Sequence, residues 1–150
     1  PSTTLFRYDE FIEGLLYIQK DDRYAFPILA LLYPHLDYKN GDFHKDHIHP
    51  ESAFSKRNLK KVGIVLDEKN EWYYTNKECW NGISNLQLLD GNENESKQAM
   101  SLVEWVRSEN IDLGKQLIPD ILDFNRFQEF IDERWAILKD KLKIELTFKA

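Results

Sequence analysis

Large apolar residues in the last part of the chain restrict the fold more than any other sequence feature. From residue 124 to residue 142 they recur at intervals of three and four positions: Phe124, Phe127, Phe130, Ile131, Trp135, Leu138 and Leu142. This spacing collects them on one side of an α-helix. Because a long helix must bury its apolar side, the pattern predicts a helical flank over 124–147 that packs against the rest of the chain.

Two more helices are predicted near the start of the chain. Residues 5–19 carry apolar positions at near-helical spacing, and residues 22–33 are apolar almost all round, which is typical of a buried helix. Pro27 falls within the first turns of the second helix, and Pro34 is a stop signal after it. These patterns predict a second helical flank over 5–34.

Short strands are predicted between the two flanks. Residues 43–49 and 84–89 each suit a strand, and residues 92–108 suit a helix with one apolar side. We therefore expect an α+β, predominantly α-helical fold. Its strand–strand–helix core, about residues 43–108, is embedded in a helical domain.

The remaining middle segments are less clearly patterned. Residues 50–63 open like a helix, with an early proline and a glycine at the end. Residues 62–82 fit a short strand, a hairpin or a short helix, and this choice stays open. Residues 110–120 are predicted to be a connector.

The composition fits a single domain over residues 1–150, since 42% of the residues are hydrophobic and no apolar run is long enough to span a bilayer. The single cysteine, Cys79, excludes an intrachain disulfide and a cysteine-rich zinc site, and it fits a reducing cytoplasm. The chain starts with Pro1 rather than methionine and shows no signal peptide. We therefore expect the C-terminal piece of a larger cytoplasmic protein.

The charge restricts the partners. A formal net charge of -6 argues against strong nonspecific DNA binding, because such binding depends on Lys and Arg that neutralise phosphates. It does not exclude a nuclease, in which a bound cation and a local basic patch serve the site.

The segment "FHKDHIHP", residues 43–50, holds three of the four histidines in the chain. Adjacent residues of a strand point to opposite faces, so Asp46 and His47 share one site only if the strand ends or bends there. A neutral histidine suits the deprotonation of a water near pH 7. A carboxylate and an amide carbonyl suit Mg²⁺. Asp46, His47 and Asn94 supply these groups, and Lys97 adds a positive charge for a phosphate.

A family resemblance rests on these residues. "DHIHP" followed by "ISNLQLLDGNENESK" resembles the His-Asn-His (HNH) endonuclease motif with its ββα-metal core, an arrangement also present in RNA-guided CRISPR effectors. The wider context, "YAFPILALLYP" before the motif and "FIDERWAILKDKL" after it, resembles the C-terminal HNH domain of GmrSD-type modification-dependent restriction and anti-phage proteins. The resemblance covers about residues 22–142.

The resemblance implies a role for each matching residue. His47 is the general base, and Asp46 and Asn94 are ligands of a divalent metal, Mg²⁺ or alternatively Mn²⁺. Asn85 ties the loop together and orients the histidine, and Lys97 is the lysine that closes the motif. The implied reaction is metal-dependent hydrolysis of DNA that leaves a 5′-phosphate and a 3′-hydroxyl.

The chain also departs from the family pattern. It lacks the second metal-binding histidine and the zinc-binding cysteines that many HNH domains carry, which favours the one-metal Mg²⁺ form. An insertion, 55–80, decorates the long gap between His47 and Asn85. It mixes basic and aromatic residues that suit either nucleic acid or a solvated face: Lys56, Arg57, Lys60, Lys61, Trp72, Tyr73 and Tyr74.

The other histidines have weaker assignments. His49 is expected to be either a phosphate contact or a turn residue. His44 is expected at the surface, and His35 is expected to have no special role.

The resemblance implies an effector domain of a bacterial restriction or anti-phage defence protein. Its partners would be DNA and an N-terminal sensor or nucleotide-binding domain of the same protein, with no membrane. Two alternatives stay open at this point. One is a non-catalytic HNH-like module that binds nucleic acid or protein, and the other is an RNase or toxin nuclease.

Overall fold

The computed structural model describes residues 2–147. In chain order, its helices (α), 3-10 helices (η) and strands (β) are α1 (Ser2–Leu15), α2 (Ala25–Leu32), β1 (Phe43–His47), η1 (Glu51–Phe54), α3 (Lys56–Lys61), α4 (Glu71–Thr75), α5 (Lys77–Trp80), η2 (Ile83–Asn85), β2 (Leu86–Asp90), α6 (Gly91–Lys97), α7 (Leu102–Ser108), α8 (Leu113–Gln116), η3 (Phe124–Arg126) and α9 (Phe127–Thr147). The fold is α+β and predominantly α-helical, as the sequence predicts.

The predicted strand–strand–helix unit is present. β1 and β2 pair antiparallel, with Asp46 opposite Gln87 and His47 opposite Leu86. The chain then turns directly into α6, because the Asp90 side chain accepts a hydrogen bond from the Glu93 backbone and the Glu93 side chain accepts one from the Asp90 backbone. This capping box fixes the start of α6 against the end of the hairpin.

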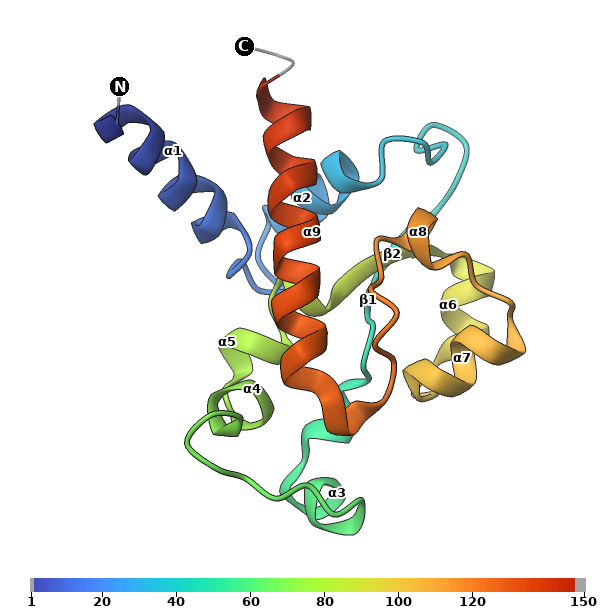
Figure 1. The fold of residues 1–150 in the computed structure, drawn as a ribbon. Helices are drawn as coiled ribbons and strands as arrows, with labels where there is room; N and C mark the ends of the chain where they lie inside the picture. The colour runs from blue at the N-terminus through green and yellow to red at the C-terminus, as the bar shows by residue number, and fades with distance from the viewer. Residues whose placement is uncertain (1, 148–150) are drawn as a thin grey trace.

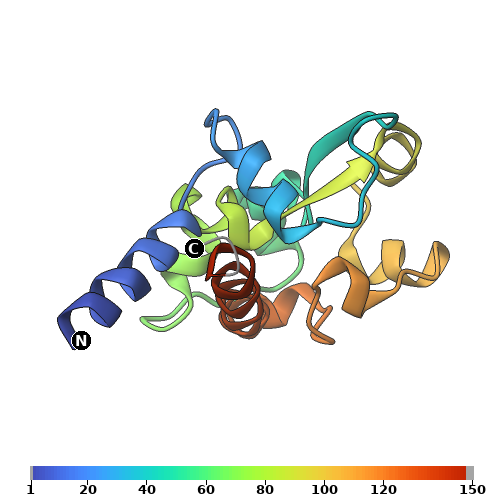
Figure 2. The same ribbon diagram turned by 90° about the horizontal axis from the view of Figure 1, so that it is seen from above.

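Helix α9 runs through the middle of the molecule, with α1 to its left in Figure 1 and α2 and the hairpin behind it and to its right. Helix α2 contacts both α9 and β2. The view from above looks nearly along α9 and shows α1 and the α6–α7 pair at opposite ends of the molecule (Figure 2). Two apolar clusters meet on this helix. Phe127 and Phe130 belong to the cluster around the end of β1, whereas Leu138 and Leu142 belong to the cluster with α1 and α2.

Arg134 of α9 is completely buried and joins segments that are distant in sequence. Its Nη1 lies 2.7, 3.0 and 3.2 Å from the carbonyl oxygens of Leu86, Ser84 and Ile83. Its Nε donates to the carbonyl of Leu117, and its Nη2 donates to the Tyr33 hydroxyl. A buried guanidinium is tolerated only when its donors are satisfied in this way.

Several predicted boundaries are wrong. The second strand begins at Leu86 rather than at residue 84 or 85, since residues 83–85 form η2. The predicted helix 92–108 is two helices, α6 and α7. Between them Gln98 has a positive φ of 44°, and the Ser101 side chain caps the new helix by accepting from the Glu104 backbone. Local capping therefore overrides the continuous apolar pattern.

The weakly patterned segments are also helical. Residues 50–63 hold η1 and α3, residues 62–82 hold α4 and α5, and the predicted connector 110–120 holds α8. Among residues 2–147, no helix is both long and apolar enough to cross a membrane.

We expect Arg134→Met to lower the free energy of unfolding by about 3 kcal/mol or more, because it leaves several buried carbonyls without a donor. Arg126→Met is the matched control, since Arg126 is exposed and its ion pair is with Glu129, three residues away. This substitution should lower the free energy of unfolding by about 0.5 kcal/mol or less. Urea unfolding followed by circular dichroism measures both. Equal losses in the two variants would contradict the structural role of Arg134.

Candidate active site

Three residues of the predicted site line one open pocket. This pocket, about 330 Å³ in volume, lies where β1 ends, and Asp46, His47 and Asn94 all contribute to its wall. Asp46 and His47 share it because β1 stops at His47 and the chain turns through an extended Pro50 into η1. The sequence indicated that Asp46 and His47 could share one site only if the strand ended there, and β1 does end at His47.

Two buried side chains hold the Asp46 carboxylate from the protein interior. Its Oδ2 accepts hydrogen bonds from Gln87 Nε2 at 3.0 Å and from Lys97 Nζ at 3.1 Å. Gln87 is itself oriented, because its Oε1 accepts from Gln116 Nε2. Within the described part of the chain, no hydrogen bond uses Asp46 Oδ1. That oxygen is the one left for a ligand in the pocket.

Lys97 does not lie where a phosphate in the pocket could contact it. Its side chain has 0% exposed surface and does not line the pocket. Its Nζ donates to the His47 carbonyl at 2.8 Å and pairs with Asp46. Burial lowers the pKa of Lys97, and the Asp46 carboxylate opposes that shift. Lys97 therefore supports the two adjacent strand residues from the interior.

The His47 imidazole is oriented by Asn81, a residue that the sequence did not single out. His47 Nε2 lies 2.8 Å from Asn81 Oδ1, while Asn81 Nδ2 donates to Gln19 Oε1 at 3.1 Å. Gln19 Nε2 in turn donates to the carbonyls of Tyr17 and Glu78. This amide relay, Gln19–Asn81–His47, ends on backbone carbonyls that can only accept.

The relay determines the tautomer of His47. Because each amide nitrogen donates to the next acceptor, Asn81 presents its oxygen to the ring, and an oxygen only accepts. Neutral His47 therefore carries its proton on Nε2 and keeps the lone pair on Nδ1. Burial lowers the pKa of His47, an effect opposed by the Asn81 hydrogen bond and increased by nearby Lys20. The ring is thus neutral near pH 7, as a general base requires.

Gly82 allows the relay to form. A Cβ at this position would lie 2.8 Å from the Glu78 carbonyl oxygen and 3.1 Å from that of Leu16. Gly82 also forms a β-bridge with Gln19, which brings the segment after α1 next to Asn81. The Asn-Gly pair at 81–82 is a typical turn sequence. A local turn pattern of this kind does not indicate the long-range contacts that Asn81 and Gly82 make with Gln19.

Asn85 ties the loop together, which confirms one part of its predicted role. Its Oδ1 accepts from the His49 backbone nitrogen, and its Nδ2 donates to the carbonyls of His49 and Trp80. The direct contact that orients the His47 ring comes from Asn81 instead. Asn85 acts through the backbone that follows His47.

His49 is part of the core, so its predicted phosphate contact is wrong. The residue is 1% exposed, and its ring packs against Phe124, Phe127 and Phe130. Its Nε2 is buried and has no hydrogen-bond partner within the described residues. Burial and the neighbouring Lys97 charge lower the pKa of His49 to about 3. His44, in contrast, lies near the surface with Nε2 3.1 Å from Asp42 Oδ2, as predicted.

Asn94 and Lys20 complete the rim of the pocket. Asn94 projects from α6, half-buried, and its side chain makes no hydrogen bond within residues 2–147. Lys20 comes from the turn between α1 and α2, far in sequence from the motif, and its backbone carbonyl accepts from Lys45 Nζ. The positive charge that was expected from Lys97 is therefore supplied at the pocket by Lys20 and Lys45.

The basic and aromatic residues of the insertion separate in space. Lys56, Arg57 and Lys60 are exposed on α3, at the lower end of the molecule in Figure 1. Tyr74 is buried and donates to the carbonyl of Phe124. The nucleic-acid role of the three basic residues stays a prediction, whereas Tyr74 belongs to the core.

Comparisons with known proteins add no family. No protein-family model matches the chain, and no curated protein matches it at a significant level. Over residues 2–147 the structure holds no group of three or more His, Cys, Asp or Glu side chains placed to bind a metal. The oxygen pair of Asp46 and Asn94 has a different composition, one carboxylate and one amide, which is the donor set that Mg²⁺ accepts when it keeps most of its water.

Stability should fall at mildly acidic pH because of His49. Its pKa is about 3 in the folded chain, whereas an unperturbed histidine has a pKa of 6.5, so below pH 6.5 the unfolded state binds a proton that the folded state does not. The free energy of unfolding should drop by about 1.4 kcal/mol per pH unit between pH 6 and pH 4 from this group alone. His49→Leu should remove that part of the slope. Identical slopes for the two proteins in urea titrations would refute this assignment.

Asn81→Ala should release the His47 tautomer. In the parent protein, ¹⁵N shifts of the ring should show a protonated Nε2 and an unprotonated Nδ1, whereas the variant should show a mixture. Asn92→Ala is the matched control, because Asn92 is exposed on α6. A ring signal unchanged in Asn81→Ala would mean that another group sets the tautomer.

Proposed function

We propose that this chain is a metal-dependent endonuclease domain of the HNH class that hydrolyses phosphodiester bonds in DNA. The observation that carries the proposal is the shared pocket. It brings together a neutral, oriented imidazole (His47), a carboxylate oxygen (Asp46 Oδ1) and an amide (Asn94), and neither of the last two has a hydrogen-bond partner among residues 2–147. These are the groups that phosphodiester hydrolysis requires.

The chain's own residues would act as follows. His47 Nδ1 takes a proton from the attacking water, and the Asn81 oxygen stabilises the ring as it becomes charged. The new bond forms between the water oxygen and phosphorus, and the bond to the 3′-oxygen breaks. The leaving oxygen takes a proton from solvent, which gives a 5′-phosphate and a 3′-hydroxyl. Lys20 adds positive charge beside the phosphate.

Asp46 and Asn94 would hold the metal through their free oxygens. A divalent cation, Mg²⁺ or Mn²⁺, supplies charge neutralisation for the phosphoryl oxygens when it is bound there. The support for this ligand set is the chemistry of the two donors and the pairing of Asp46 Oδ2 with Gln87 and Lys97, which leaves Oδ1 to the pocket.

The biological setting rests on the sequence resemblance. It indicates the effector part of a bacterial restriction or anti-phage defence protein that acts in the cytoplasm, with a sensor or nucleotide-binding domain preceding it. The net charge of -6 agrees with a domain that relies on another part of the protein to hold DNA.

One observation favours a second candidate, a non-catalytic HNH-like module that binds nucleic acid or protein. Asp46 supplies the only carboxylate of the predicted ligand set. The positive charge of buried Lys97 offsets the negative charge of this carboxylate and so weakens its attraction for a metal cation. A module of this kind would keep the fold and lose the metal. Metal binding measured by calorimetry separates the two candidates directly.

We expect the chain to nick plasmid DNA with Mg²⁺ or Mn²⁺ and to stop in EDTA. His47→Ala should lower the rate about 100-fold or more, the range for loss of a general base. His44→Ala is the matched control from the same segment, since His44 lies outside the pocket, and it should cleave normally.

Three results decide between the candidates. Unchanged cleavage by His47→Ala would rule out the proposed base. Absence of both cleavage and metal binding in the parent protein would favour the non-catalytic module. Parallel assays on duplex DNA, single-stranded DNA and RNA identify an RNase or toxin nuclease, which would cleave RNA in preference to DNA.

A further inference from the structure

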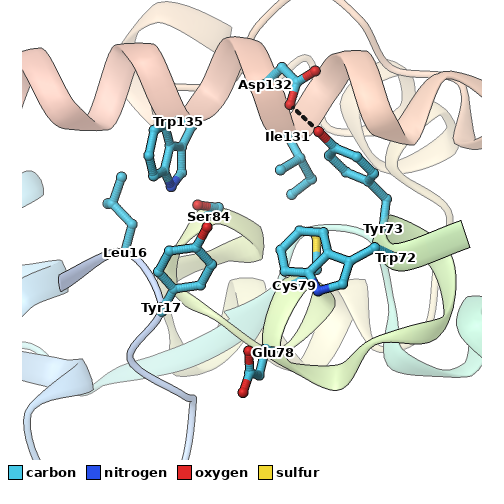
Figure 3. Close-up of a pocket in the computed structure, with 10 residues that line it drawn as sticks. All are labelled: Leu16, Tyr17, Trp72, Tyr73, Glu78, Cys79, Ser84, Ile131, Asp132 and Trp135. Carbon is cyan, nitrogen blue, oxygen red and sulfur yellow. Dashed lines mark hydrogen bonds between the residues drawn. The ribbon is translucent and has the colours of Figure 1, made fainter. Parts of the chain in front are cut away.

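A second pocket lies away from the candidate active site, between α9, the α4–α5 pair and the segment that follows α1 (Figure 3). Its volume is about 180 Å³. Four aromatic residues line it, and three of them are called the aromatic cage below: Tyr17, Trp72 and Trp135; the fourth is Tyr73. None of the residues proposed for phosphodiester hydrolysis contributes to it.

The cage rings stand at steep angles to one another. The Tyr17 ring centroid is 6.3 Å from that of Trp72, with 72° between the planes, and 6.3 Å from that of Trp135, with 63° between the planes. Figure 3 shows the three rings around an open centre rather than stacked on one another. An aromatic ring is electron-rich on its face and electron-poor at its edge, so it is the ring faces turned towards the open centre that would attract a small cationic guest.

The charge around the cage is negative. Glu78 and Asp132 both line the pocket, and no Lys or Arg of residues 2–147 does. Asp132 accepts a hydrogen bond from the Tyr73 hydroxyl at 2.7 Å, which holds the carboxylate in the wall. Burial raises the pKa of Tyr17, with further contributions from Cys79, Glu13 and Glu78. An anionic guest such as a phosphate is therefore disfavoured.

One cation already lies near the cage. Lys139 Nζ is 5.9 Å from the centre of the Trp135 ring, and it pairs with Glu13 Oε1 at 2.8 Å. Lys139 does not line the pocket, and its charge is balanced by Glu13. The pocket carboxylates, Glu78 and Asp132, thus remain without a basic side chain of their own among the described residues.

We propose that the aromatic cage binds a small quaternary ammonium compound. The face of an aromatic ring attracts a cation electrostatically, and enclosure by several rings is the known way in which proteins recognise methylated ammonium groups. The negative charge of Glu78 and Asp132 complements such a guest. The volume, below the roughly 300 Å³ of pockets for drug-sized ligands, restricts the guest to a compact head group. This proposal is independent of the nuclease function.

The test compares choline with 3,3-dimethylbutan-1-ol, which has the same shape without the charge. The four tryptophans provide the readout, because Trp72 and Trp135 line the pocket whereas Trp80 and Trp105 do not. In ¹H–¹⁵N spectra we expect choline at about 10 mM, which largely fills a millimolar site, to shift only the first two indole signals. The neutral alcohol should bind about tenfold more weakly or worse.

Variants separate charge from shape. Glu78→Gln should weaken choline binding and leave the alcohol unaffected, while Glu68→Gln, at an exposed acid outside the pocket, should change neither. Trp72→Leu should abolish the choline-induced shift of the Trp135 indole signal. Because Trp72 is 38% exposed, the variant should still fold, and thermal unfolding checks this. Glu78→Gln keeps the test valid if Trp72→Leu does not fold.

Either of two outcomes overturns the proposal. The first is an absence of saturable indole shifts with choline at that concentration. The second is equal affinity for choline and the neutral alcohol, which would show an apolar pocket without selectivity for a cation.

Discussion

The buried guanidinium of Arg134 is the interaction on which the rest of the structure depends. Residues 83–86 change from a 3-10 helix to a strand, and the buried backbone carbonyls at this change need hydrogen-bond donors; the Leu86 backbone N–H supplies one for Ile83. Arg134 reaches three of them from α9 with a single nitrogen. The central helix thus sets the place where β2 begins, and with it the register of the hairpin.

The register of the hairpin places the end of β1, and thus the candidate active site, through two contacts. His47 pairs with Leu86, the first residue of β2, and Asn85 holds the backbone of His49 on the other side of the strand end. The end of β1 is therefore clamped on both sides. Because β1 ends there, Asp46 and His47 face one pocket, although neighbours within a strand would face opposite sides.

The sequence predicted the motif residues and the fold class, and it failed where contacts are long-range. Asp46, His47 and Asn94 were found because their types and order suggest a chemistry, and the structure brings them to one pocket. Asn81 and Lys20 were missed, since each lies in a turn whose local pattern says nothing of a partner far away in sequence. Burial, which decides the roles of His49 and Lys97, also depends on helices outside the motif.

The two pockets share one structural element. Gln19 Nε2 donates to the carbonyls of Tyr17 and Glu78, and both residues line the aromatic pocket. The Oε1 of the same side chain accepts from Asn81, which orients the His47 ring. The amide that sets the tautomer of the candidate base is therefore anchored on the wall of the second pocket. Because both anchors are backbone carbonyls of residues in that wall, a shift of the wall backbone would also move the amide that orients His47.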